Sequence, residues 1–273
     1  MSNKGMVKRL APGPLWSVLH LAPGPLREAA RELHCRFSWK AVKSLRRLRR
    51  FRNAYRGRRC FIIGNGPSLK RTDLSLLRDE VTFGLNRIYL AFDELGFATT
   101  FLVSVNRLVI KQCADEMTRL PCTKFMNWHA RGSIALTRDM MFLRSRYPPK
   151  GKPFYRNPEH GICEGSTVTY VAMQLAFYMG FGEVVLIGVD HSFATKGPPC
   201  QEVVSSGDDR DHFDPRYFGK GFRWNLPDLE DSERHYRIAR AVFEADGRRI
   251  VDATIGGKLE VFPKVDYLSL FRK

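Results

Sequence analysis

The stretch "FIIGNGPSL", residues 61–69, joins a short apolar run to a turn built from two glycines, an asparagine, a proline and a serine. An apolar run that enters a Gly-rich bend is typical of a buried strand, and Pro67 with Ser68 suits the first turn of a helix. Unpaired backbone N–H groups at such a junction favour an anion, and glycine lets a phosphate or ribose approach the backbone. The stretch matches neither a standard dinucleotide fingerprint nor a P-loop. It therefore predicts a nucleotide-binding junction or, equally, a tight turn with a purely structural role.

The segments after this turn alternate between apolar runs and helical patterns. Strands are predicted at 81–86, 99–105, 122–128, 183–191 and 248–254, with helices at 108–120, 166–181 and 232–247 and a helix or turn at 68–77. Continuously apolar strands separated by helices indicate a mostly parallel sheet with both faces covered. We therefore predict a Rossmann-like α/β fold. Open sheets of this kind bind ligands beyond the carboxyl ends of their strands.

The charge distribution divides the chain into two parts. The net charge is +17, and 14 of these excess positive charges lie within residues 1–59, so the remainder is nearly balanced. This asymmetry argues against a nucleic-acid-binding surface spread over the fold, and we expect no nucleic-acid partner. The expected organisation is a basic arm over residues 1–58 and a nucleotide-binding catalytic domain over 59–273.

The arm combines a repeated turn motif with a basic amphipathic helix. The hexapeptide "LAPGPL" occurs at 10–15 and 21–26, and apolar residues then recur every three or four positions from Arg27 to about Tyr55, with arginines between them. Such a helix either lies on an anionic membrane surface or packs its apolar stripe on the body. The cysteines form no C-x-x-C pair, and no run of about 18 apolar residues occurs. We therefore expect a cytoplasmic protein without structural zinc or disulfides, held peripherally at the inner face of the membrane.

Residues 194–229 are rich in Gly, Pro, Asp and aromatic residues and have no periodicity, so we expect a lid over the site. Five of its residues form an acidic cluster with a histidine: Asp208, Asp209, Asp211, His212 and Asp214. Their spacing does not follow the calcium-loop pattern. A solvated loop is therefore preferred over a metal site, and no metal ligand is assigned.

The segments "GNGPSLKRTDLSLL…VTFGLNRIYL" and "YMGFGEVVLIGVDHSF" resemble two related groups of proteins. One is the MptE-like superfamily, named for archaeal 6-hydroxymethylpterin diphosphokinase, and the other is the bacterial sialyltransferases of glycosyltransferase family 42. The likeness spans roughly residues 59–262. In the sialyltransferases, asparagines matching Asn65, Asn86 and Asn106 hold the CMP-sugar donor, and an uncharged amide suits that task because it both donates and accepts hydrogen bonds.

The resemblance implies a donor site and leaves the general base open. The residues expected to bind the donor are Gly64, Asn65, Gly66, Ser68, Asn86, Asn106, Ser166, Thr167, Asp190 and Ser192. Ser166 or Thr167 can also cap the following helix, and Ser192 stands where the sialyltransferases carry a tyrosine. The general-base histidine of the sialyltransferases falls near Glu230, which could itself be the base, and the nearest histidine, His235, lies five positions later. The alternative base is His191, whose ring the neighbouring Asp190 can orient.

These observations predict a transferase. The first hypothesis is a glycosyltransferase that moves a sugar, such as a sialic-acid-like one, from a CMP-linked or other nucleotide-activated donor to a membrane-borne or envelope glycan. The second is an MptE-like diphosphokinase, which needs ATP and Mg²⁺ and would use aspartates such as Asp190 or Asp208 to hold the metal. The third is a catalytically silent, partner-binding member of the fold.

Overall fold

The structure is a computed structural model that describes residues 38–146 and 153–272. The repeated hexapeptides, Cys35 and the first part of the predicted amphipathic helix lie outside these residues. The chain forms two compact units, Met1–Val42 and Lys43–Lys273. The second unit contains the sheet and the candidate site.

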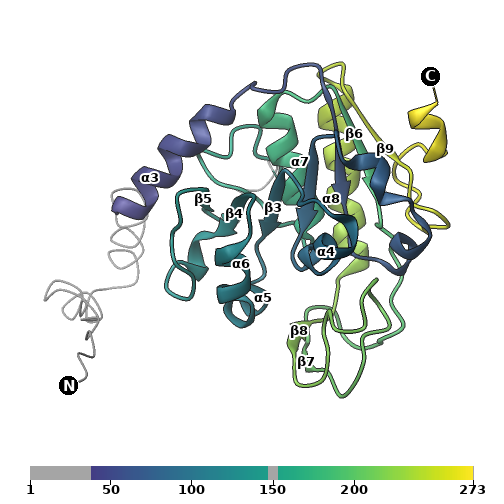
Figure 1. Cartoon of the computed structure of the whole chain (residues 1–273). Coiled ribbons are helices and arrows are strands. Elements are labelled where there is room, and N and C mark those ends of the chain that lie inside the picture. The colour runs from purple at the N-terminus through teal and green to yellow at the C-terminus, as the bar shows by residue number, and fades with distance from the viewer. Residues whose placement is uncertain (1–37, 147–152, 273) are drawn as a thin grey trace, which may run out of the picture. The chain divides into compact units, whose positions relative to one another are not determined.

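A seven-stranded parallel sheet forms the centre of the second unit (Figure 1). Its spatial order is β5-β4-β3-β2-β1-β6-β9. The strands are β1 (Arg59–Ile63), β2 (Thr82–Leu85), β3 (Phe101–Ser104), β4 (Thr123–Asn127), β5 (Met140–Leu143), β6 (Glu183–Ile187) and β9 (Arg249–Asp252). The chain steps outward from β1 to β5 and then returns to pair β6 with the other side of β1. The strand order therefore reverses between β1 and β6, which confirms the predicted Rossmann-like fold.

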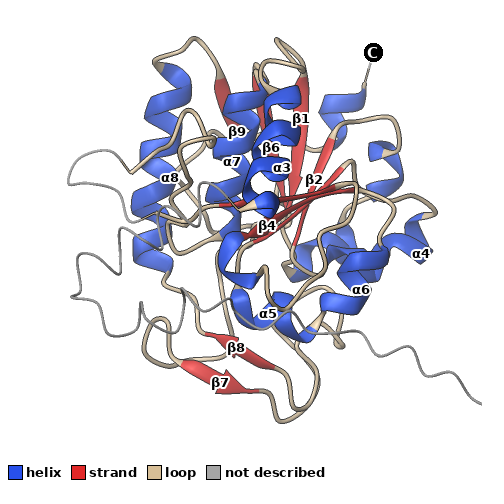
Figure 2. Cartoon of the chain, turned by 90° about the vertical axis from the view of Figure 1, so that its left-hand side faces the viewer, coloured by secondary structure: helices blue, strands red, loops and turns tan. Residues whose placement is uncertain are grey.

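Helices cover both faces of the sheet, with α7 and α8 on one side and α4, α5 and α6 on the other (Figure 2). The α-helices are α3 (Trp39–Leu48), α4 (Phe92–Leu95), α5 (Arg107–Gln112), α6 (Ala114–Arg119), α7 (Val168–Met179) and α8 (Leu229–Glu244). Short 3₁₀ helices are η1 (Arg49–Phe51), η2 (Pro67–Arg71), η3 (Leu74–Leu77), η4 (Ile88–Ala91), η5 (Trp128–Ala130) and η6 (Leu268–Phe271). None of the helices in residues 38–146 and 153–272 is long and apolar enough to cross a membrane.

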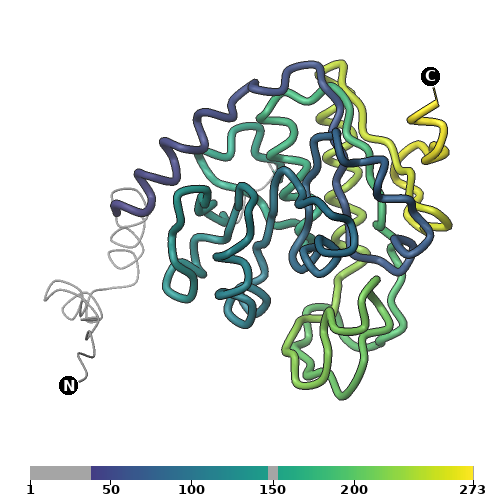
Figure 3. The backbone as a smooth tube through the Cα atoms, viewed as in Figure 1, coloured from purple at the N-terminus to yellow at the C-terminus, as the bar shows by residue number. Residues whose placement is uncertain are grey.

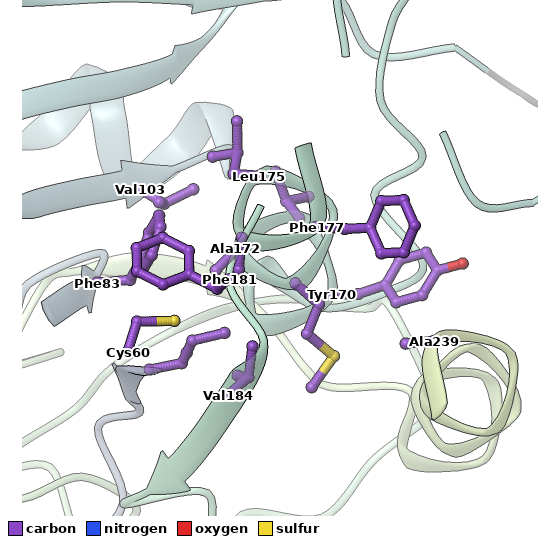
Figure 4. Packing of buried hydrophobic residues seen from close by; sticks show 14 of the residues in the cluster. Cys60, Phe83, Val103, Tyr170, Ala172, Leu175, Phe177, Phe181, Val184 and Ala239 are labelled. Carbon is purple, nitrogen blue, oxygen red and sulfur yellow. The ribbon is translucent and has the colours of Figure 1, made fainter. Parts of the chain in front are cut away.

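The core lies between the sheet and α7 (Figure 4). Cys60, Phe83 and Val103 of the strands pack with Ala172 and Leu175 of α7. All of β1 after its first residue is buried, because alternate side chains of a strand enter opposite faces and both faces here are covered. Burial of β1 on both faces explains why its sequence is continuously apolar.

Residues 43–58 belong to the same compact unit as the sheet. Leu48 is only 3% exposed, and Phe51 and Tyr55 pack on the core, where the Phe51 ring lies 5.6 Å from that of Phe101. The backbone N–H of Tyr55 donates to the carbonyl of Met179 at the end of α7. The sequence-based boundary at residue 59 thus falls inside this unit. Of the two roles left open for the amphipathic helix, packing on the body holds for these apolar residues.

Helix α3 also covers the outer edge of β5. The Oγ of Ser44 accepts a hydrogen bond from the backbone N–H of Phe142 at 3.0 Å. The Arg47 guanidinium donates to the carbonyls of Thr137 (2.5 Å) and Met140 (2.7 Å). Side chains of α3 therefore satisfy backbone groups that an edge strand would otherwise leave unpaired.

Residues 194–229 lie beyond the carboxyl end of the sheet (Figures 1 and 3). They contain an antiparallel pair, β7 (Glu202–Val204) and β8 (Arg223–Asn225), that the sequence reading missed. Strands of three residues are too short to show periodicity. We call residues 194–229 the lid.

Candidate functional site

The loops after β1 and β6 meet at the point where the strand order reverses. The Gly64 N–H donates to the carbonyl of Ile187 (2.8 Å), and the Gly66 N–H to that of Gly188 (2.9 Å). A Cβ on Gly64 would lie 2.2 Å from the Gly188 oxygen. The two backbones are thus in contact, and a side chain at position 64 would force them apart.

Asp190 closes the turn that follows β1. Its carboxylate accepts hydrogen bonds from the backbone N–H (3.0 Å) and the Oγ (2.6 Å) of Ser68. A Cβ on Gly66 would lie 1.9 Å from Asp190 Oδ2. The donors of the Pro67–Ser68 turn that were expected to hold an external anion therefore hold this carboxylate. The side chain of Asp190 is directed at Ser68, so the prediction that it orients His191 is wrong.

The three predicted asparagines follow three adjacent strands but have different surroundings. Asn65 donates to the carbonyl of Leu85 (3.0 Å), and its Oδ1 is buried without a hydrogen-bond partner within the described residues. Asn86 Oδ1 accepts from the Oγ of Ser104 (2.9 Å). Asn106 Oδ1 caps α5 by accepting from two backbone N–H groups, at 2.9 and 3.3 Å. The oxygen of Asn65 thus has no partner among the described residues, whereas that of Asn106 serves the helix.

A fourth asparagine continues this series. Asn127 ends β4 and is 1% exposed. Its amide donates to the carbonyl of Val105 and to Glu164 Oε1, both at 2.9 Å, and its Oδ1 accepts from the N–H of His129 at 2.9 Å. The sequence reading missed it, although the same spacing of about twenty residues separates it from Asn106. Because all of these bonds lie within the chain, we assign Asn127 a structural role.

His191 follows β6 directly beside the reversal point. Its Nε2 lies 3.0 Å from Glu233 Oε1 of α8, and its side chain is 8% exposed. No hydrogen bond to its Nδ1 is found within the described part of the chain. A carboxylate that accepts from Nε2–H leaves the Nδ1 lone pair free to take a proton. The orienting group is therefore Glu233, which the sequence reading did not identify, and not Asp190.

The other two candidate bases lie in different surroundings. Glu230 is exposed in the first turn of α8. His235 is buried, with its Nδ1 2.8 Å from the carbonyl of Asp231 and its Nε2 3.8 Å from Cys163 Sγ. Burial raises the pKa of the Cys163 thiol, so this thiol stays protonated at neutral pH. Glu230, His235 and His191 thus do not form one catalytic group.

Ser166 and Thr167 tie the start of α7 to α8. Ser166 Oγ donates to Asp231 Oδ2 (2.5 Å), and Thr167 Oγ1 lies 3.1 Å from the Tyr236 hydroxyl. Thr167 is the N-cap residue of α7, as predicted. Ser192 is half-buried just before the lid.

Backbone conformation also marks this region. Asn86, Ser166 and His191 have positive φ values of 47°, 57° and 55°. For residues with a side chain, such values are costly and persist where the surroundings impose them, which occurs often at functional sites. The three strained residues therefore support the placement of the site at this edge of the sheet.

The lid is fastened over this edge by the body. The Phe213 N–H donates to the carbonyl of Asn65 (2.9 Å), and buried Arg87 donates to the carbonyls of Arg216 (2.8 Å) and Tyr217. The Tyr217 ring stacks on His212 at 3.9 Å between centroids. The sequence reading missed Arg87 and Tyr217, since only the folded lid brings them together. A separate hollow of about 530 Å³ lies beside α4 and not at the reversal point.

The acidic residues of the lid hold the lid itself. Asp209 binds His212 (2.8 Å), Asp211 accepts from Thr195 Oγ1 (2.6 Å), and Asp214 pairs with Arg216 (2.6 Å). Among residues 38–146 and 153–272, no group of three or more His, Cys, Asp or Glu side chains is placed to hold a metal ion. The expectation of a solvated loop is wrong for Asp209, Asp211 and Asp214, because these carboxylates have fixed partners within the lid.

Comparison with known proteins identifies the family. A sequence model of the family described as "6-hydroxymethylpterin diphosphokinase MptE-like" matches residues 38–196, more than half of the chain. The chain belongs to the MptE-like family. Among solved structures, this MptE-like chain is similar to the MAf glycosyltransferase from Magnetospirillum magneticum AMB-1, with a TM-score of 0.48 and 15% sequence identity. That alignment covers 90% of this chain and 43% of the other, so this chain spans less than half of that structure. The comparison with curated proteins found no match.

The MptE-like match covers only part of the candidate site. It includes the turn at 64–68, the asparagines after β1 to β4, and His191. Most of the lid and all of α8, which carries Glu233, lie beyond its end at residue 196. The MptE-like part therefore supplies the strand ends with their asparagines and His191. The segment after it supplies most of the lid, which covers them, and Glu233, which orients His191.

Proposed function

We propose that this protein is a nucleotide-dependent transferase whose nucleotide binds where the strand order reverses, beneath the lid. The carrying observation is the buried Oδ1 of Asn65, which has no hydrogen-bond partner in the described chain. Such an oxygen costs about 1–3 kcal/mol when left unsatisfied. A ribose hydroxyl or a base amino group would supply the missing donor.

We propose glycosyl transfer as the reaction, from a nucleotide-activated donor to an envelope glycan. The resemblance of the Gly-Asn-Gly-Pro-Ser turn and its asparagines to the CMP-sugar site of sialyltransferases supports a CMP-linked, sialic-acid-like donor. The acceptor hydroxyl would form a bond to the anomeric carbon while the bond to the CMP phosphate breaks and CMP keeps the electron pair. His191 Nδ1 would take the hydroxyl proton, and Glu233 would stabilise the resulting imidazolium.

Diphosphate transfer from ATP is the second candidate, and the family description supports it. Mg²⁺ is usually held by one or two carboxylates together with substrate phosphates. Of the aspartates expected to serve, Asp190 has both oxygens bonded to Ser68, and Asp208 is exposed on the lid. These two residues do not form a magnesium site.

Nucleotide binding provides the test. Thermal shift and calorimetry with CMP, CDP, UDP and ATP, each with and without Mg²⁺, should show stabilisation by CMP. Asn65→Ala should weaken CMP binding about 2- to 12-fold, which corresponds to one hydrogen bond of about 0.5–1.5 kcal/mol. Asn157→Ala is the matched control, because Asn157 is also half-buried but only caps a local turn through the N–H of Glu159. Stabilisation by ATP with Mg²⁺ alone would favour diphosphate transfer, and no response to any nucleotide would refute the proposal.

The proposed base requires a separate measurement. His191→Ala should lower sugar transfer about 10²- to 10⁴-fold while CMP affinity stays unchanged. Glu233→Gln should shift the pH profile of transfer, since it removes the charge that stabilises the imidazolium. Glu230→Ala changes an exposed acid of the same helix and should leave transfer unaffected. Full activity in His191→Ala would remove His191 from the mechanism.

A further inference from the structure

A groove of about 320 Å³ beside α3 is lined entirely by cationic residues: Lys43, Arg46, Arg47, Arg50 and Arg138. We call it the α3 groove. The first four residues are spaced i, i+3, i+4 and i+7, so they form one stripe along α3 and η1. Arg138 comes from the turn before β5. Strand β5 is separated from β1 by β4, β3 and β2, so the α3 groove is distinct from the candidate nucleotide site.

The two walls of the α3 groove are fixed to each other. Arg47 donates to the carbonyls of Thr137 and Met140 on either side of Arg138, and Leu48 is buried in the core directly after it. Arg46, Arg50 and Arg138 remain exposed. The backbone of the groove is therefore in place before any ligand arrives, and binding has to order only these exposed side chains.

The four arginines of the α3 groove have no protein counterion in the described part of the chain. Arg46, Arg47, Arg50 and Arg138 make no ion pair there. The adjacent Asp139 is bonded to the buried Lys124 and to Thr137 Oγ1 (2.6 Å). Burial acts to raise the pKa of Asp139, but these hydrogen bonds lower it below its usual range, so the carboxylate is ionised and already paired. By contrast, Arg237 and Arg240 on α8 each pair with a glutamate one turn away.

Like charges three and four residues apart repel one another, and a bound anion would remove that repulsion. Guanidinium groups present planar forks of donors that match phosphate oxygens. We propose that the α3 groove binds a multivalent phosphate anion, either a phosphorylated lipid headgroup or a soluble di- or triphosphate. A lipid source would give the peripheral membrane attachment expected from the basic N-terminal region. That attachment would be electrostatic, since Leu48, Phe51 and Tyr55 pack on the core and are not available to enter the bilayer.

The test uses the full chain and two sources of phosphate. Calorimetry with inorganic tripolyphosphate measures binding of a soluble phosphate. Sedimentation with phosphatidic acid/phosphatidylcholine vesicles, compared with phosphatidylcholine vesicles alone, measures binding of a lipid phosphate. The variant is Arg46→Gln with Arg50→Gln and Arg138→Gln, which leaves Arg47 in place because it holds β5. A matched control removes three exposed cations elsewhere: Lys111→Gln, Arg119→Gln and Lys258→Gln.

At about fivefold per cation, the groove variant should bind about 100-fold more weakly, while the control stays within a few fold. Unchanged thermal unfolding of the groove variant shows that the fold is intact. Groove-dependent binding of tripolyphosphate alone identifies a soluble ligand, and groove-dependent vesicle binding identifies the membrane. Equal weakening in both variants, or no binding in either measurement, would overturn the proposal. The groove variant leaves the candidate nucleotide site intact, so only binding that this variant weakens is assigned to the groove, and that outcome is independent of the proposed transferase function.

Discussion

Replacing Asp190 with alanine should lower the free energy of unfolding by about 3 kcal/mol. The carboxylate accepts two hydrogen bonds from Ser68, whose side chain is 1% exposed, and hydrogen bonds to charged groups contribute about 1.5–3 kcal/mol each. We use the lower end of this range because Asp190 itself is half-buried and water can replace part of what is lost. Urea unfolding of the full chain at pH 7 measures the change.

Two further variants separate a structural role from ligand binding. Asp190→Asn keeps one oxygen for Ser68 and should lose about half as much stability. Ser68→Ala combined with Asp190→Ala should show strong coupling in a double-mutant cycle, since both changes remove the same bonds. If Asp190→Ala unfolds like the wild type but no longer binds nucleotide, Asp190 contacts the ligand and our account of the turn is wrong.

Three other predictions test the fold around the site. Leu48→Ala should lower the free energy of unfolding in urea by about 2–5 kcal/mol, because it leaves a cavity where α3 meets the core. A negligible change would show that Leu48 does not pack on the core. Asn127→Ala should lower the free energy of unfolding by about 2–4 kcal/mol in the same assay, because the Val105 carbonyl and Glu164 lose their hydrogen bonds. Nucleotide affinity should stay unchanged, and a loss of affinity without a loss of stability would show that Asn127 binds the ligand. The pKa of Asp209 is lowered, because burial raises it less than its bonds with His212 and nearby backbone N–H groups lower it. Its stabilising effect is therefore full above the ordinary pKa of about 3.9 and is lost as pH falls through the lowered pKa, so hydrogen exchange of residues 205–220 should increase below about pH 4 in the wild type. The increase should be smaller in Asp209→Asn, where Asp214, whose pKa is also lowered, still titrates, and an equal increase would show that Asp209 does not hold the lid.

The sequence predicted the sheet well because each strand is buried on both faces. The runs at β1 and β6 are continuously apolar, and the caps of α7, Thr167 and Gly180, lie where expected. Local patterns predicted the remaining elements less well. The helix expected at 108–120 is divided into α5 and α6 at Cys113. Strand β5 was missed because an apolar run of four residues is too short to show a period.

The sequence predicted which strand ends lie together, but not how their side chains pair. Strand ends of a parallel sheet must meet at one edge, so the turn at 64–68, Asn86 and His191 were assigned together. Which group orients His191 depends on α8, whose Glu233 comes 42 residues later in the chain. Neighbours in sequence favoured Asp190, but that carboxylate accepts hydrogen bonds from Ser68, which follows the adjacent strand β1. Side-chain pairings of this kind depend on packing between elements, which spacing does not reveal.

The contact between α3 and β5 also bears on how the protein behaves at high concentration. An open edge strand offers unpaired N–H and C=O groups to the same strand of another molecule, which leads to intermolecular sheets and aggregation. Ser44 and Arg47 occupy these groups on Phe142 and Met140. A helix rich in arginine therefore protects the sheet in two ways: its side chains block strand addition, and its charge makes two molecules repel each other at the edge where they would otherwise join.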